Sequence, residues 1–135
     1  MLSNHLRMQP KKKTKFYNWR AMIRSHSRRI WLWSPMRKEA IQNARTSKGM
    51  VQCQSCGVEM RERETPKKYQ VDHIQPASEP AAQILNWNSF FERLFCDVSG
   101  LWVLCESCHE TKTRKENLSR KKKYKRAKSR NKKRG

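Results

Sequence analysis

The chain has 135 residues, of which 36% are hydrophobic and 32% are charged, so it has room for one small domain with a limited apolar core. No run of about 18 apolar residues is present, which excludes a membrane-spanning helix, and a core of this size often needs a metal ion or disulfides. The start, MLSNHLRMQPKKKTK, lacks the apolar segment of a signal peptide. We therefore expect a cytoplasmic, reducing location, where cysteine pairs bind metal more often than they form disulfides.

The positive charge, formally +21 in total, is concentrated at the two ends of the chain. Residues 1–50 hold 13 lysines and arginines against one glutamate, and residues 111–135 hold 14 against one, whereas residues 51–110 hold five basic and nine acidic residues. Basic arms of this kind suit a polyanion, because each neutralised phosphate releases counterions. A nucleic acid is the expected partner, although a ribosome-bound or RNA-coating protein and a solvated tail fit the same pattern.

The first part of the chain predicts a basic arm followed by a helical extension. Residues 1–15 are expected to be a disordered N-terminal arm, and residues 16–49 to pack as helices on the domain that follows. Within the extension, apolar residues recur with helical spacing and arginines lie on the opposite face. Ser34 followed by Pro35 is typical of a helix start, so a second helix is predicted up to about Ser47. The apolar residues of the first helix are Phe16, Trp19, Ile23 and Ile30.

The second part predicts a small α+β domain over residues 50–118. An asparagine, either Asn86 or Asn88, is expected to cap a helix inserted between two strands. Residues 119–135 are predicted to be a basic disordered tail, because like charges on adjacent helical turns repel. In chain order, the domain has predicted strands at 51–53 and 69–74, a loop at 76–82, a helix ending near 95, a strand at 101–104 and a helix from 105.

Four cysteines form two CxxC pairs. A CxxC turn lets two thiolates approach one ion, and two such turns complete a tetrahedral zinc site that stabilises a small domain. A redox pair and unliganded thiols are the alternatives, and the absence of a redox-fold pattern favours zinc. The pairs are 48 residues apart, so a substantial segment is inserted between them. Cys96 lies outside both pairs and is expected to be a small buried apolar residue. The predicted zinc ligands are Cys53, Cys56, Cys105 and Cys108.

A carboxylate and two imidazoles are the candidate catalytic groups. Asp72 and His73 are adjacent on a predicted strand, and a pair of this kind is by itself an ordinary surface feature. His109, however, directly follows the last zinc cysteine, which fixes its position. If the two predicted strands pair, all three side chains converge at the start of the final helix, where the helix dipole also favours a phosphate.

Taken together, these motifs resemble the zinc-containing HNH (ββα-metal) endonuclease family. The resemblance is firm over residues 51–113 and loose over residues 16–50, and the segment FFERLFCDVSGLWVLC is similar to small bacteriophage HNH proteins. Each motif alone is weak, and the combination is specific. The motifs are Cys53-x-x-Cys56, Val71-Asp72-His73-Ile74 and the run LWVLCESCHETKT from Leu101 to Thr113.

The resemblance implies a metal-dependent DNA endonuclease. His73 would be the general base that activates water, and Asp72 and His109 would hold one Mg²⁺ or Mn²⁺ ion beside the phosphate. The zinc would be structural only. The implied substrate is double-stranded DNA, with a monomeric protein, no membrane association and a partner in phage packaging or replication. Lys112 and Arg114 are candidates for contacts with flanking phosphates, with plain solvent exposure as the alternative.

One position departs from the family pattern. An asparagine that braces the catalytic loop usually precedes the leucine of LxxLC, and this chain has Gly100 there. Glycine lacks the side chain to make those hydrogen bonds. The alternative function is therefore a catalytically weak or inactive zinc-stabilised module that binds nucleic acid, or a phage accessory protein.

Overall fold

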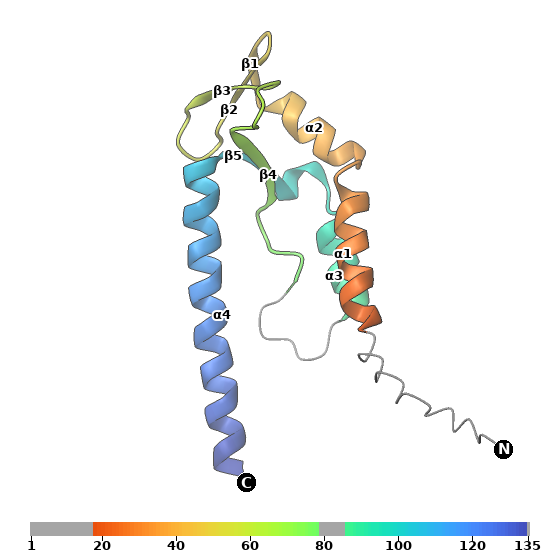
Figure 1. Cartoon of the computed structure of the whole chain (residues 1–135), viewed down its shortest axis with the longest axis vertical. Coiled ribbons are helices and arrows are strands. Elements are labelled where there is room, and N and C mark those ends of the chain that lie inside the picture. Colours follow the sequence, from red (N-terminus) through yellow and green to blue (C-terminus); the bar gives the residue numbers. More distant parts are fainter. Residues whose placement is uncertain (1–17, 79–85, 135) are drawn as a thin grey trace, which may run out of the picture.

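The computed structural model describes residues 18–78 and 86–134, which form a mixed α+β fold with short antiparallel strands (Figure 1). The predicted disordered arm at residues 1–15 and most of the predicted loop at 76–82 lie outside this range. In chain order the elements are α1 (Trp19–Trp31), α2 (Pro35–Asn43), β1 (Arg45–Ser47), β2 (Met50–Gln52), β3 (Glu59–Arg61), β4 (Tyr69–His73), α3 (Trp87–Leu94), a 3-10 turn (Val98–Gly100), β5 (Leu101–Cys105) and α4 (Glu106–Arg134).

Two small antiparallel sheets organise the chain. One has the strand order β1-β2-β3, and the other pairs β4 with β5. In the β4–β5 pair, Tyr69 lies opposite Cys105 and His73 lies opposite Leu101. Because α4 begins directly after β5, this pairing places the start of β4 beside the start of α4. The helix then runs back along β4, so that Asp72 near the end of β4 lies beside Lys112. The predicted helix inserted between these two strands is α3.

The apolar core is formed by buried residues of α2, α3 and the β4–β5 pair, and α2 packs on the two strands. Phe90 and Leu94 of α3 are each 1% exposed, and Val103 of β5 is fully buried. Ala40 and Ile41 supply the buried face of α2. Burial of a side chain the size of Phe90 or Leu94 contributes about 1.5–3 kcal/mol, so these residues anchor the inserted helix in the core.

Three helices begin at side chains suited to capping. The Asn18 side chain accepts a hydrogen bond from Ala21 N at the start of α1. Ser34 caps α2 with Pro35 in its first turn, as predicted. Asn86, rather than Asn88, caps α3. Each cap satisfies one backbone N–H that the helix leaves without an internal partner.

The second helix ends earlier than predicted. It ends at Asn43 and not near Ser47, because the next residues form β1, in which Arg45 lies opposite Val51 of β2. Gly49 has a φ of 75°, a conformation that glycine adopts without strain, and it turns the chain between the two strands. In this segment, pairing with β2 thus outweighs the local helix propensity.

The predicted disordered C-terminal tail is also wrong. The helix α4 continues through this segment to Arg134 and extends well beyond the rest of the fold (Figure 1). It contains no glycine or proline, and lysine and arginine have good intrinsic helix propensity. None of the helices in residues 18–78 and 86–134 has the length and apolar composition needed to cross a membrane.

Candidate functional site

The four paired cysteines come together as predicted. Their sulfur atoms all lie within 4.8 Å of one another, and Cys56 Sγ is 3.7 Å from Cys105 Sγ. Cys53 follows β2, Cys105 ends β5 and Cys108 lies in the first turn of α4, so two distant parts of the chain contribute. Four thiols in this arrangement are a donor set suited to a soft, tetrahedral ion such as zinc.

Backbone and amide hydrogen bonds dock the first cysteine turn on β5. Gln54 N donates to Val103 O at 2.9 Å, and Val103 N donates back to Gln54 Oε1 at 2.6 Å. Gly57, with a φ of 79°, closes the turn by donating from its N to Cys53 O at 2.9 Å. These hydrogen bonds hold the turn against β5.

The protonation of the cluster also suits a cation. Burial alone would raise the pKa of Cys53, but hydrogen bonds, chiefly from the Cys56 backbone N–H, lower it to about 6. The Ser55 side chain acts to lower the pKa of Cys108, yet contact with the Cys105 thiol and burial raise it to about 12. One thiolate thus forms easily and another only with difficulty. A bound divalent cation would favour the deprotonated form of all four thiols.

Cys96 takes no part in the cluster. It lies just after α3, half-buried and packed against the core, and burial raises the pKa of its thiol. It therefore behaves as the small apolar residue that was expected, although it is less completely buried.

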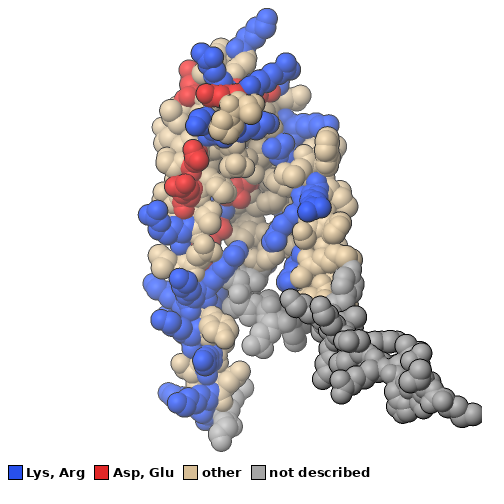
Figure 2. All heavy atoms as spheres, in the orientation of Figure 1, with Lys and Arg blue, Asp and Glu red and all other residues tan. Residues whose placement is uncertain are grey.

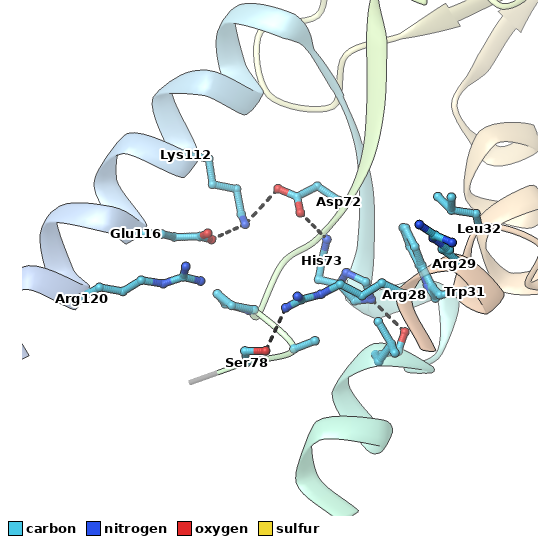
Figure 3. Close-up of a pocket in the computed structure, with 13 residues that line it drawn as sticks. Arg28, Arg29, Trp31, Leu32, Asp72, His73, Ser78, Lys112, Glu116 and Arg120 are labelled. Carbon is cyan, nitrogen blue, oxygen red and sulfur yellow. Dashed lines mark hydrogen bonds and ion pairs between the residues drawn. The ribbon is translucent and has the colours of Figure 1, made fainter. Parts of the chain in front are cut away.

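Asp72 and His73 line a common hollow at the end of β4, as Figure 3 shows. Asp72 Oδ1 accepts a hydrogen bond from His73 N at 2.8 Å, and its Oδ2 lies 3.0 Å from Lys112 Nζ. Lys112 also donates to Glu116 on the next turn of α4. Burial alone would lower the pKa of Lys112, but the bonds to Glu116 and Asp72 outweigh it and raise that pKa. The ammonium group therefore stays charged between two carboxylates.

The His73 ring is held from two sides. Its Nε2 lies 2.8 Å from Leu94 O, and the Trp31 ring packs on it with 4.5 Å between the ring centroids. A carbonyl oxygen only accepts, so Nε2 carries the proton in this bond and Nδ1 holds the lone pair of the neutral ring. His73 is 9% exposed, yet it lines the hollow. The imidazole is thus held in one orientation, and in its neutral form it is the Nε2–H tautomer.

His109 and Arg114 lie elsewhere on α4. Both line a second hollow, along α4, that contains neither Asp72 nor His73. Within the part of the chain that the structure describes, the cysteines are the only set of three or more His, Cys, Asp or Glu ligand atoms within 4.8 Å of one another. Of the two predicted ligands of the catalytic cation, Asp72 is paired with Lys112, and His109 lines a different hollow.

Several residues of the hollow were not predicted as functional. The hollow has a volume of about 350 Å³ and lies between α1, the end of β4 and α4. Arginines on one face of the first helix were expected, but nothing in their spacing indicated that they would face α4. The unpredicted polar and aromatic residues that line the hollow are Arg28, Arg29, Trp31, Ser78, Glu116 and Arg120.

Comparisons of the chain with protein-family models, with curated proteins and with solved structures find no match. Membership of the HNH family is therefore a proposal. The support for it comes from the residues of this chain and their contacts.

Proposed function

We propose that this protein is a metal-dependent endonuclease of the HNH type that hydrolyses phosphodiester bonds in double-stranded DNA. The observation that carries the proposal is the hollow at the end of β4, in which Asp72 and His73 lie beside several arginines. A carboxylate, an imidazole and cationic side chains around one open space are the groups that phosphodiester hydrolysis needs. The cysteine cluster fixes the start of α4 and hence one wall of this space.

His73 is the proposed general base. Its Nε2 is bonded to Leu94 O, which leaves Nδ1 to accept a proton from water. The Trp31 ring and the bond to Leu94 keep the imidazole from rotating, so the base is positioned in advance. An imidazole suits this role because its unperturbed pKa is close to neutral pH.

Asp72 and His109 are the proposed ligands of a Mg²⁺ or Mn²⁺ ion. Asp72 already binds a positive group, the Lys112 ammonium, so a metal ion would take the place of that ammonium on the carboxylate. His109 lies three residues before Lys112 in α4 but lines a different hollow, so its side chain would have to turn toward Asp72 to share the ion. Lys112 would have to leave Asp72 and remain with Glu116. When bound, the cation would stabilise negative charge on the phosphate.

A second candidate function is a zinc-stabilised nucleic-acid-binding module without catalysis. One observation favours it: Asp72 is occupied by Lys112, and His109, the second proposed metal ligand, lies outside the hollow. Such a protein would use its basic surface alone. Lys and Arg side chains gather along the lower part of α4, away from the acidic side chains near the start of the helix (Figure 2). A role as a phage accessory protein would be a variant of this function.

The deciding experiment is plasmid cleavage by zinc-loaded protein. Supercoiled plasmid would be incubated with added Mg²⁺ or Mn²⁺, and the protein would be compared with His73→Ala and with a sample lacking the added cation. His26→Ala is a matched control, since His26 is exposed and bonds only within α1. Nicking by the wild type and His26→Ala, but not by the other two samples, supports the endonuclease. Retardation of the plasmid without cutting, with every cation tried, favours the binding module.

A further inference from the structure

Two guanidinium groups meet in the hollow from opposite walls. Arg28 extends from α1 and Arg120 from α4, and Figure 3 shows both directed into the space beside Asp72 and His73. Arg28 Nη2 donates to Ser78 Oγ at 2.9 Å. Arg120 Nε is buried and has no hydrogen-bond partner within residues 18–78 and 86–134. Two cationic groups with donors to spare thus face one small space.

The charges that line the hollow do not balance. Four lining residues are cationic and two are anionic, and both carboxylates are already engaged by Lys112. The structure gives no carboxylate partner to Arg28 or Arg120 among the residues that it describes. Burial lowers the pKa of Arg28, and the positive charges of Arg24 and Arg120 lower it further. Like charges that line one hollow are stabilised by an anion bound between them.

We propose that Arg28 and Arg120, with the Ser78 hydroxyl, form a subsite for a phosphate of the nucleic-acid backbone. Guanidinium groups present paired N–H donors that match the oxygens of a phosphate, and a hydroxyl adds a further donor. The assignment to a backbone phosphate rests on the proposed function, because the subsite lies in the same hollow as Asp72 and His73. The proposal also gives α1 a function, since this helix supplies Arg28 and lies on the side of the hollow opposite α4.

The first test uses inorganic phosphate and no nucleic acid. Arginine Nε–Hε resonances of the zinc-loaded, ¹⁵N-labelled protein would be followed by NMR as phosphate is added at constant ionic strength. Arg28 and Arg120 are expected to shift together and to saturate with one dissociation constant. Arg126 and Arg130, on the exposed part of α4, are the matched controls and should show small shifts without saturation. If Arg28 and Arg120 behave like these controls, the subsite does not exist.

The second test decides the source of the phosphate. A short DNA duplex would be bound without added divalent cation by Arg28→Gln/Arg120→Gln and by Arg126→Gln/Arg130→Gln, which lose the same charge. The first variant is expected to bind about tenfold more weakly than the second, because charge-assisted hydrogen bonds are lost. Added inorganic phosphate should weaken wild-type binding and leave that of the first variant unchanged. Equal affinities of the two variants would overturn the assignment to a backbone phosphate.

Neither test depends on cleavage. Circular dichroism and zinc content would verify that Arg28→Gln/Arg120→Gln is folded. If the plasmid is not cut but both tests succeed, the endonuclease proposal fails and the phosphate subsite stands. If the plasmid is cut but Arg28 and Arg120 do not saturate, the subsite fails and the endonuclease stands.

Discussion

Gly100 lies against the side chain of Cys96, so closely that a Cβ at position 100 would stand 2.8 Å from Cys96 Sγ and 3.3 Å from Cys96 Cβ. The backbone of Gly100 is tied down as well, because its carbonyl accepts from Ile74 N at 2.9 Å and its N donates to Asp97 O at 2.8 Å. Any side chain here must displace Cys96 or shift this turn. Packing against Cys96 therefore accounts for a glycine at this position.

The contact predicts a coupled pair of substitutions. Gly100→Ala is expected to destabilise the fold by about 1–3 kcal/mol, the usual cost of forcing an atom into a packed site. In a Cys96→Ala background the sulfur is gone, so the same substitution should cost clearly less. Urea unfolding of the four proteins of this double-mutant cycle measures the difference. Additive effects of the two substitutions would show that the close approach is not what excludes a side chain at position 100.

The ion pair between Lys112 and Asp72 predicts competition with a metal ion. If a divalent cation binds Asp72, it must displace the ammonium group that lies 3.0 Å from Asp72 Oδ2. Lys112→Ala should therefore lower the Mn²⁺ concentration that gives half-maximal plasmid nicking. Lys115→Ala is the matched control and should leave it unchanged, because Lys115 is exposed and does not line the hollow of Asp72.

A direct binding measurement makes the same prediction independent of cleavage. Titration with Mn²⁺, followed by electron paramagnetic resonance, is expected to give tighter binding to Lys112→Ala than to the wild type. Weaker Mn²⁺ binding to Lys112→Ala would mean that Lys112 supports the site, and the competition would be excluded.

The cysteine cluster predicts a stability effect that packing alone does not explain. Cys56 is exposed, so replacement of its sulfur by oxygen removes little buried apolar surface. If the cluster holds zinc, Cys56→Ser nevertheless loses a ligand of an ion whose binding to small zinc domains is worth roughly 10–16 kcal/mol. A loss of several kcal/mol in the free energy of unfolding is therefore expected. Cys96→Ser should have a smaller effect, because Cys96 lies outside the cluster.

Metal analysis would accompany the unfolding measurements. The wild type and Cys96→Ser should each release one zinc ion per chain to a strong chelator, with loss of the near-ultraviolet circular dichroism signal. Retention of that signal after zinc removal would show that the cluster is not needed for the fold.

The parts of this structure that local chemistry determines could be predicted from the sequence. Ser34 caps α2 through its own side chain, and the paired spacing of Cys53 and Cys56 fixes two sulfurs of the cluster. The parts that depend on distant segments could not. Whether Arg28 faces solvent or α4, and whether Lys112 or His109 is beside Asp72, depends on helix placement, and residue spacing does not encode it. The β1 strand was missed for the same reason, since pairing with β2 outweighs its local helix signal.

The continuous α4 helix predicts both helicity and electrostatic binding in the C-terminal segment. Residues 125–135 hold seven lysines and arginines and no acidic residue, and the described part is exposed. Truncation after Tyr124 keeps Arg120 and should reduce the helical far-ultraviolet signal as well as the salt dependence of duplex binding. If all seven charges contact phosphates, the slope of log K against log salt falls by about 6.

Ala127→Pro separates charge from helix in this segment, because it interrupts α4 at a cost of about 3 kcal/mol and removes no charge. Non-specific contacts with phosphates depend on charge, so this variant should lose helicity but keep most of the salt dependence that the truncation removes. Circular dichroism and duplex titrations over a range of salt concentrations would measure both. A variant that loses as much affinity as the truncated chain would show that DNA is recognised by the straight helix itself. The basic end of α4 would then act as a rigid extension of the site and not as a flexible source of charge.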